Sequence, residues 1–150
     1  MGIALMHQIT ATPTASSAFI KLKEDGTAEV QVSTVDMGQG SNTVLAQIAA
    51  EELGIRVEDV HIVRADTEIT PYDHGTSSSR STFHMGNAVR AAAMDAKRQL
   101  FEAAADLLEA NPLDLVASEG SIFVKGFPER MIPIHQIPMG SSYFGKGKPI

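Results

Sequence analysis

Apolar and polar residues alternate over residues 17–34, SAFIKLKEDGTAEVQVST. A period of two places neighbouring side chains on opposite faces of a strand. The apolar positions are Ile20 and Leu22 before the turn, and Ala28, Val30 and Val32 after it. Asp25-Gly26 between the two runs is a strong hairpin signal, because glycine accepts the positive φ of such turns. The pattern predicts a β-hairpin with one buried face.

Two longer segments carry apolar residues at the three- and four-residue spacing of a helix. The first begins near Ser41 or Asn42, which are suitable N-caps, and ends at Gly54, a typical C-terminal stop. The second covers residues 82–110 and ends at Asn111-Pro112, and its length is about 28 residues or about 42 Å. The apolar positions are Val44, Leu45, Ile48, Ala49 and Leu53 in the first segment, and Val89, Ala93, Ala96, Leu100, Ala103 and Leu107 in the second.

Shorter apolar runs predict further strands. Residues 57–66 predict a third strand with Val60 and Ile62 on one side. Residues 114–126, DLVASEGSIFVKG, predict a second hairpin that turns at Glu119-Gly120.

The order of the predicted elements is hairpin, helix, strand, helix and hairpin. This order favours a two-layer α+β fold, in which one mixed β-sheet carries both helices on one face. We expect a single domain over residues 1–150, without internal repeats or linkers. The tail, residues 127–150, contains four prolines, and its apolar residues show no regular spacing. We therefore expect strand or turn segments there that are incomplete on their own.

Composition and charge narrow the classes of function. Of the 150 residues, 43% are hydrophobic and 20% are charged, and the net charge is −6. Nucleic acid is not an expected partner, because phosphate backbones are bound by concentrated positive charge. A membrane span is not expected either, since no apolar run approaches about 20 residues, and MGIALMHQ lacks signal-peptide features. Without cysteine there are no disulfides or thiolate metal ligands, and the cytoplasm is the default location.

Two predicted strand-to-helix turns concentrate glycine and hydroxyl residues. We call residues 36–43, DMGQGSNT, the GQG turn, and residues 75–82, GTSSSRST, the serine-rich turn. Each precedes a helix, where free amides and the helix dipole favour an anion. Arg80 adds a charge that can bind a phosphate or oxo group. Plain loops with N-caps explain the same residues, so both interpretations stay open. The phosphate-loop and dinucleotide-binding glycine patterns are absent.

Other candidate residues are weaker. The five histidines lack metal-ligand spacing, so a zinc site is not expected. His74 and His84 flank the serine-rich turn and can touch a ligand, although packing or solvent roles are commoner. No serine lies in the glycine-flanked elbow of a hydrolase nucleophile. Asp66 and Asp73 bracket a Thr-Pro turn, and we expect them to cap it rather than to act as a base.

The two turns in their sequence context resemble a known family. DMGQGSNTVLAQIAAEELGI followed by ADTEITPYDHGTSSSRSTFHMGNAVRAAA is similar to the molybdenum-binding subunits of the xanthine dehydrogenase and aldehyde oxidase family. GIALMHQ and SSAFIKLKEDGTAEVQVS extend the match, which covers residues 2 to about 126. Either turn alone is unspecific, whereas the pair in this order and spacing is specific.

The resemblance implies a molybdopterin cofactor, expected as the cytosine dinucleotide form in a bacterium. The Gln39 side chain would hydrogen-bond to the molybdopterin, and the serine-rich turn would surround the pterin and its phosphate. The backbone at Ser78 would lie near the molybdenum, without a direct side-chain ligand. The implied cofactor-binding residues are Gly38, Gln39, Gly40, Ser77, Ser78, Ser79, Arg80, Ser81 and Thr82.

The resemblance also implies parts that this chain lacks. In the family a glutamate in a glycine-rich motif acts as the base, and nothing after Lys125 matches that motif; Glu129 is the only acid there. An arginine-bearing cofactor loop that precedes this region in the family is missing too. We therefore expect a fragment of a molybdopterin-binding subunit without a catalytic residue, inactive alone.

We expect the parent protein to be a molybdenum hydroxylase. It would oxidise N-heterocycles or aldehydes with water as the oxygen donor, and its electrons would pass to iron–sulfur and flavin (FAD) partners. Its other expected partners are the remaining segments of the subunit and a small-molecule substrate. Two alternatives stay open, a non-catalytic binding or assembly module and a small phosphate-binding enzyme acting alone.

Overall fold

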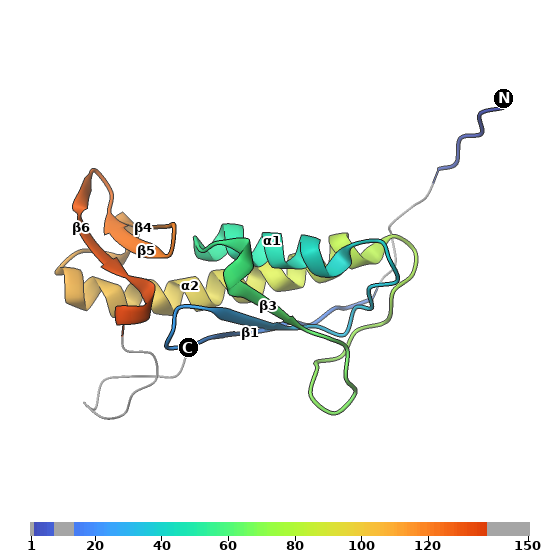
Figure 1. Cartoon of the computed structure of the whole chain (residues 1–150), viewed down its shortest axis with the longest axis horizontal. Helices are drawn as coiled ribbons and strands as arrows, with labels where there is room; N and C mark the ends of the chain where they lie inside the picture. Colours follow the sequence, from blue (N-terminus) through green and yellow to red (C-terminus); the bar gives the residue numbers. More distant parts are fainter. Residues whose placement is uncertain (1, 8–13, 138–150) are drawn as a thin grey trace.

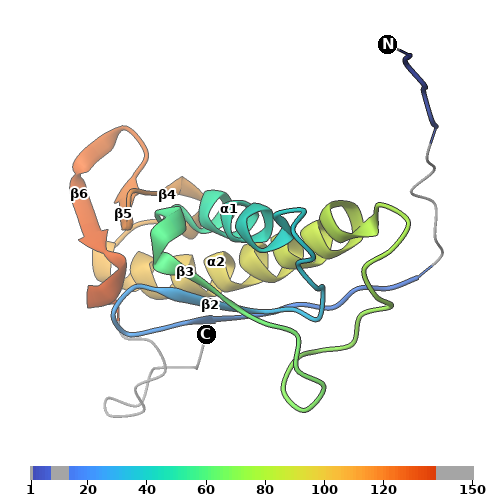
Figure 2. The ribbon, with the colours of Figure 1, turned by 45° about the vertical axis from the view of Figure 1, so that its right-hand side comes forward.

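A mixed three-stranded sheet lies against a layer of two helices in the computed structural model, which describes residues 2–7 and 14–137 (Figure 1). The elements are β1 (Phe19–Leu22), β2 (Ala28–Gln31), β3 (Val60–Val63), α1 (Ser41–Leu53) and α2 (Gly86–Leu108). β2 pairs antiparallel with β1 and parallel with β3. Both helices cover the same face of this sheet (Figures 1 and 2). The predicted first hairpin and the two-layer α+β fold are confirmed, whereas the expectation of one mixed sheet is wrong, because the second hairpin forms a sheet of its own.

The core lies between this sheet and the helices. Ala28 and Val30 of β2 are fully buried, as the alternation predicts. The helices contribute the fully buried side chains of Leu45, Ala49 and Leu53 from α1, and Val89, Ala93 and Leu100 from α2. The predicted stripe is wrong at the end of α2, where Leu107 is 50% exposed and Ala104 is buried instead. That end of α2 packs against a second sheet, so its buried face is set by a different partner.

The second sheet is an antiparallel meander at one end of the helix layer (Figure 1). Its strands are β4 (Leu115–Ser118), β5 (Ser121–Val124) and β6 (Phe127–Pro133). β4 and β5 form the predicted second hairpin, and β6 shows that the tail continues as a seven-residue strand beside β5. The expectation for residues 138–150 lies outside the described residues.

The long predicted helix begins with an irregular turn. Ser81–Met85 forms a π-helical turn (η2) that continues directly into α2, and the Gly86 amide donates to the carbonyls of Ser81 and Phe83. Wide turns of this kind inside helices often occur at functional sites. α2 ends at Leu108, two residues before the predicted end, because Glu109 adopts a left-handed conformation with φ 47°. Arg130 of β6 donates to the Leu108 and Glu109 carbonyls and so completes this helix end.

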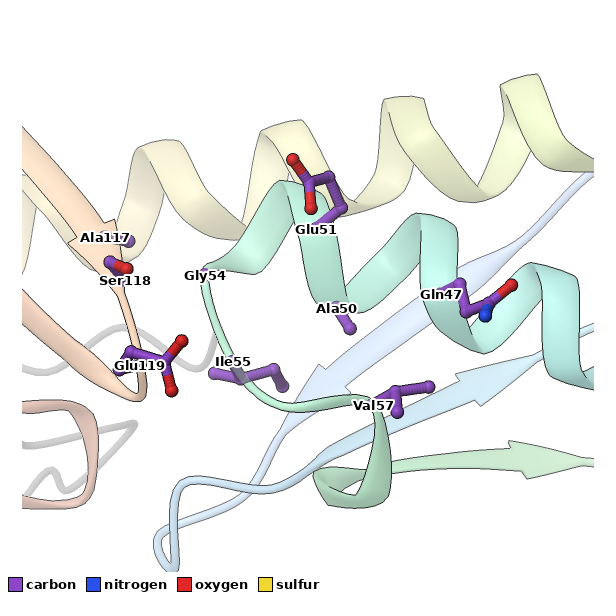
Figure 3. Close-up of a pocket in the computed structure, with 9 residues that line it drawn as sticks. All are labelled: Gln47, Ala50, Glu51, Gly54, Ile55, Val57, Ala117, Ser118 and Glu119. Atoms are coloured by element: carbon purple, nitrogen blue, oxygen red, sulfur yellow. The ribbon is translucent and has the colours of Figure 1, made fainter.

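The end of α1 lies directly on the β4–β5 turn (Figure 3). Gly54 follows α1 with φ 72°, as the predicted C-terminal stop requires, and its carbonyl accepts a 2.9 Å hydrogen bond from the Gly120 amide. A side chain at Gly54 would have its Cβ 2.5 Å from the backbone carbonyl carbon of Ala117. The contact borders an open pocket of about 480 Å³ with Glu51 and Glu119 on its rim. This junction fixes the second sheet to the helix layer.

No helix among the described residues is long and apolar enough to cross a membrane. No group of three or more His, Cys, Asp or Glu side chains in the described ranges is placed to hold a metal ion.

Candidate functional site

The two candidate turns lie at the same end of the helix layer, opposite the second sheet (Figures 1 and 2). The chain leaving β2 runs beside residues 70–76. The Ser33 hydroxyl donates to the Pro71 carbonyl and lies 2.8 Å from the Thr70 hydroxyl. The Val35 amide donates to Thr76 Oγ1 over 2.8 Å. The structure therefore brings together two segments that are about 40 positions apart in the sequence.

One carbonyl links the two turns directly. The Val35 carbonyl accepts from Thr76 Oγ1 over 3.3 Å and from Gln39 Nε2 over 2.9 Å. Thr76 belongs to the serine-rich turn and Gln39 to the GQG turn. The two turns therefore meet at one carbonyl group.

The GQG turn is closed by Asp36. Its carboxylate accepts from the amides of Gly38 over 2.9 Å, Gly40 over 3.4 Å and Asn42 over 3.1 Å. The hydrogen bonds from Gly38 and Asn42 lower the pKa of the Asp36 carboxyl below its ordinary value. The expectation of free amides at the start of α1 is wrong at these three positions, because the chain supplies its own anion.

The Gln39 side chain also bonds within its own turn. Its Oε1 accepts from the Met37 amide over 2.6 Å, and its Nε2 donates to Ser41 Oγ over 3.1 Å as well as to Val35. Gln39 is nevertheless exposed. Gly40, rather than Ser41 or Asn42, is the N-cap of α1, with φ 79° and open space where a Cβ would stand. The GQG turn therefore offers an exposed amide group and a bare glycine surface.

The serine-rich turn is exposed and conformationally unusual. Ser77, Ser78, Ser79 and Thr82 are exposed, and Ser81 is half-buried. Ser78 and Ser79 have φ 49° and 55°, a left-handed conformation that costs a residue with a side chain about 1–2 kcal/mol. Consecutive residues of this kind persist only where the surroundings hold them, and they cluster at functional sites. Four hydroxyl side chains of the turn, those of Ser77, Ser78, Ser79 and Thr82, are therefore accessible to a ligand.

Arg80 is the exception within this turn, because its side chain is completely buried. Its Nη1 donates to Asp73 Oδ1 over 2.6 Å and to the Gly75 carbonyl over 2.9 Å. Its Nη2 donates to the Ala15 carbonyl and to Ser16 Oγ, and its buried Nε has no partner in the described part of the chain. The expectation that Arg80 forks onto an anion is therefore not met: both terminal nitrogens are bound to protein oxygens.

Asp73 is the site residue that sequence reasoning missed. It was expected to cap a turn, and its Oδ2 does accept from the Gly75 amide over 3.3 Å. Its larger role is to pair with Arg80 and to accept from Ser16 Oγ over 2.6 Å and from Thr34 Oγ1 over 3.3 Å. The opposite charges seven positions apart were the only signal in the sequence, and no local rule pairs residues across an irregular loop.

The remaining candidates lie at the edges of the site. Asp66 caps its own turn, since its carboxylate accepts from the Glu68 amide over 2.9 Å. His74 is exposed, and His84 packs edge-on against Phe83 with ring centroids 5.1 Å apart. An open pocket of about 440 Å³ adjoins the GQG turn, and its lining residues are Thr34, Val35, Asp36, Asn42, Arg64 and Ala65.

The Asp73 carboxyl gives the site a defined dependence on pH. Burial raises its pKa, but hydrogen bonds from Ser16 and Arg80, with the charge of Arg80, outweigh burial and hold the pKa below its usual value. A carboxyl whose pKa is lower in the folded state stabilises the fold above its unfolded pKa of about 3.9, and loses that contribution as the pH falls through the folded pKa.

We expect Asp73→Asn to destabilise the chain at pH 7 and to matter progressively less in strong acid. Asparagine resembles the protonated carboxyl, so the free energies of unfolding of wild type and variant should converge only below about pH 4. Urea denaturation at a series of pH values between 7 and 3 measures this difference. A difference that is already lost at pH 5, or one that is constant down to pH 3, contradicts the assignment.

Comparison with known proteins identifies the family of this chain. Residues 1–149 match the molybdopterin cofactor-binding domain. The chain belongs to this family. It is 41% identical over 118 residues to the 6-hydroxypseudooxynicotine dehydrogenase complex subunit gamma of Paenarthrobacter nicotinovorans, covering 79% of this chain and 15% of that protein. It is 32% identical over 130 residues to the xanthine dehydrogenase molybdenum-binding subunit of Escherichia coli O157:H7, covering 85% and 17%.

A solved relative shows the same molybdopterin-binding fold. The crystal structure of quinoline 2-oxidoreductase from Pseudomonas putida 86 superposes with a TM-score of 0.79 at 34% identity, covering 89% of this chain and 17% of that one. The predicted resemblance to the xanthine dehydrogenase family is thereby confirmed, and so is the α+β fold. The chain spans only about one sixth of the length of these relatives.

Proposed function

We propose that this molybdopterin-binding domain holds the cofactor between the GQG turn and the serine-rich turn, as part of a larger molybdenum hydroxylase. The observation that carries the proposal is the Val35 carbonyl, which accepts from Gln39 and Thr76 at once and so joins the two turns into one surface. The cofactor-binding residues of the proposal are Gly38, Gln39, Gly40, Ser77, Ser78, Ser79, Ser81 and Thr82. Arg80, which the resemblance also implied, is buried against Asp73 and is not among them.

The residues present fit a phosphorylated heterocycle. Gly38, Gly40 and Gly75 have positive φ and open space where a Cβ would stand, so a flat ligand can approach the backbone closely. The exposed hydroxyls of the serine-rich turn can donate to phosphate oxygens. Asp36 already neutralises the amides of the GQG turn, so that turn suits the uncharged donors and acceptors of a pterin ring better than its phosphate.

Each residue has a separate task in this proposal. Gln39 presents an exposed amide at the edge of the ring: its Oε1 has a second lone pair for a ring donor, and its Nε2 can exchange the bond to Ser41 for a ring acceptor while it keeps the bond to Val35. Ser77, Ser79 and Thr82 would replace water around the phosphate, and the backbone at Ser78 would lie near the metal. When bound, the cofactor supplies the redox chemistry that hydroxylates the substrate carbon with oxygen from water. These residues bind and orient it and move no proton.

The finer assignments extend the same proposal. The cytosine dinucleotide form of the cofactor, an N-heterocycle or an aldehyde as substrate, and iron–sulfur and FAD partners follow from the resemblance of the two turns to the family. The relatives are named as a subunit of a dehydrogenase complex and as a molybdenum-binding subunit, which supports partner subunits here. The base of the reaction would come from outside the two turns, since no carboxylate in them is free: Asp36 binds three amides.

Two matched glycine variants test the proposal in the intact protein, produced in cells that make molybdopterin. Gly40 lies in the GQG turn with φ 79°, and Gly126 lies in the β5–β6 turn with φ 84°; both have open space at the Cβ position. Asparagine tolerates positive φ, so replacing either glycine with asparagine fills this space with little strain. We expect Gly40→Asn to lower molybdenum and pterin per chain about tenfold, equivalent to about 1.4 kcal/mol of binding.

The control variant, Gly126→Asn, should retain the wild-type cofactor content. Equal content in both variants would argue for a non-catalytic binding or assembly module, in which the GQG turn is only structural. Thermal denaturation of both variants, with equal melting temperatures, shows that the difference in content does not arise from unfolding.

A further inference from the structure

The buried pair of Asp73 and Arg80 is a feature that binding of a ligand does not explain. Both side chains are 0% exposed and their charged atoms lie 2.6 Å apart. Taking two charges out of water is costly, and the cost is offset where the geometry is good and further hydrogen bonds are made, as both terminal nitrogens of Arg80 make here. Here the pair encloses Ser78 and Ser79, two consecutive residues in the left-handed conformation.

The pair closes the serine-rich turn on itself. The Arg80 guanidinium binds the Asp73 carboxylate and the Gly75 carbonyl, and the Arg80 amide donates to the Ser77 carbonyl over 3.0 Å. Residues 74–79 are therefore tied at both ends. Ser78 and Ser79, in the left-handed conformation, lie inside this closed loop and are exposed. Their conformation depends on the closure, because their own side chains form no hydrogen bond to another described residue.

The same pair fixes the turn to two other segments. Ser16, on the chain before β1, donates to Asp73 and accepts from Arg80 over 2.8 Å. Thr34, on the chain after β2, donates to Asp73. Because Thr34 precedes Val35, whose carbonyl binds Gln39 and Thr76, the pair also sets the position of one turn against the other.

We propose that Asp73 and Arg80 are positioning residues, which hold Ser78 and Ser79 in the conformation that binds the cofactor and do not contact the cofactor themselves. The cofactor part of this inference rests on the proposed function, whereas the part about the loop conformation does not. If Arg80 instead contacted a phosphate of the cofactor directly, this contact would not need Asp73. Replacing Asp73 would then leave the cofactor content unchanged, whereas replacing Arg80 would lower it.

A double-mutant cycle in the intact protein separates the two roles. The variants are Asp73→Asn, Arg80→Met and the double variant, and the readout is molybdenum and pterin per chain. We expect each single variant to lose cofactor about tenfold, and the double variant to lose no more than the worse single one, because one shared interaction is removed. If Asp73→Asn keeps or raises the cofactor content while Arg80→Met lowers it, Arg80 binds the ligand directly and the proposal is wrong.

Hydrogen exchange of the cofactor-free full chain tests the loop without any ligand. We expect Ser16→Ala, which removes one partner of both charged groups and leaves the pair in place, to speed exchange of the residue 75–80 amides about tenfold, with β4–β6 unchanged. Unchanged exchange at residues 75–80 would overturn the positioning role. This mild variant keeps the test valid where Asp73→Asn or Arg80→Met fails to fold. If the wild-type protein carries no cofactor while exchange responds as expected, the proposed function fails and the positioning role stands.

Discussion

Replacing Gly54 with alanine is expected to destabilise the chain by about 2 to 5 kcal/mol, the sum of a left-handed conformation imposed on alanine and an overpacked contact. Gly54 has φ 72°, and a Cβ there would lie 2.5 Å from both the carbonyl carbon and the oxygen of Ala117. Backbone atoms cannot move aside as a flexible side chain can. The junction between α1 and the β4–β5 turn would have to open, and the 2.9 Å bond between Gly54 and Gly120 would be lost.

Gly120 supplies a matched control for this prediction. It has the same φ of 72°, but nothing lies within 4 Å of the position of its Cβ. Gly120→Ala should therefore cost only the conformational strain, about 1–2 kcal/mol. Urea denaturation of both variants gives the two free energies of unfolding. Equal losses would show that the close approach to Ala117 is not what constrains Gly54.

The second large effect is expected at Leu100, in the middle of α2. Its side chain is fully buried in the core, so Leu100→Ala should leave a cavity and lower the free energy of unfolding by about 3 kcal/mol or more. Leu107 lies on the same helix and is 50% exposed, although the spacing of apolar residues predicted it to be buried. Leu107→Ala changes helix propensity equally and should cost less than about 1 kcal/mol.

The comparison of these two leucines also tests the assignment of the buried face of α2. Thermal or urea denaturation resolves a difference of this size in a domain of this length. A loss at Leu107 that matches the loss at Leu100 would place the predicted stripe, rather than the observed one, in the core.

Local sequence patterns predicted the structure correctly where residues close together along the chain determine it. The hairpin around Gly26, the end of α1 at Gly54 and most of the buried stripe of α2 follow from turn chemistry and periodicity. β6 carries no alternation, because most of its side chains are exposed and its pairing with β5 defines it. The exposure of Leu107 likewise depends on the second sheet, which its own segment cannot specify.

Some features of the candidate site were likewise predictable from local sequence, and others were not. The two turns and their exposed residues were predictable from glycine and hydroxyl residues placed before helices. The occupation of the amides by Asp36 and the burial of Arg80 were not, because both depend on which groups the fold brings within hydrogen-bond distance. Asp36, Asp73 and Arg80 form their hydrogen bonds within the protein, so the proposed site leaves exposed neutral groups for a ligand.

Hydrogen exchange of the intact protein, purified from cells that make molybdopterin and from cells that cannot, tests the central claim most directly. The claim is that both turns bind one cofactor. We predict slower exchange at residues 36–43 and at residues 75–82 in the loaded protein, with no change in β4–β6. Protection of only one turn, or of neither, would contradict it.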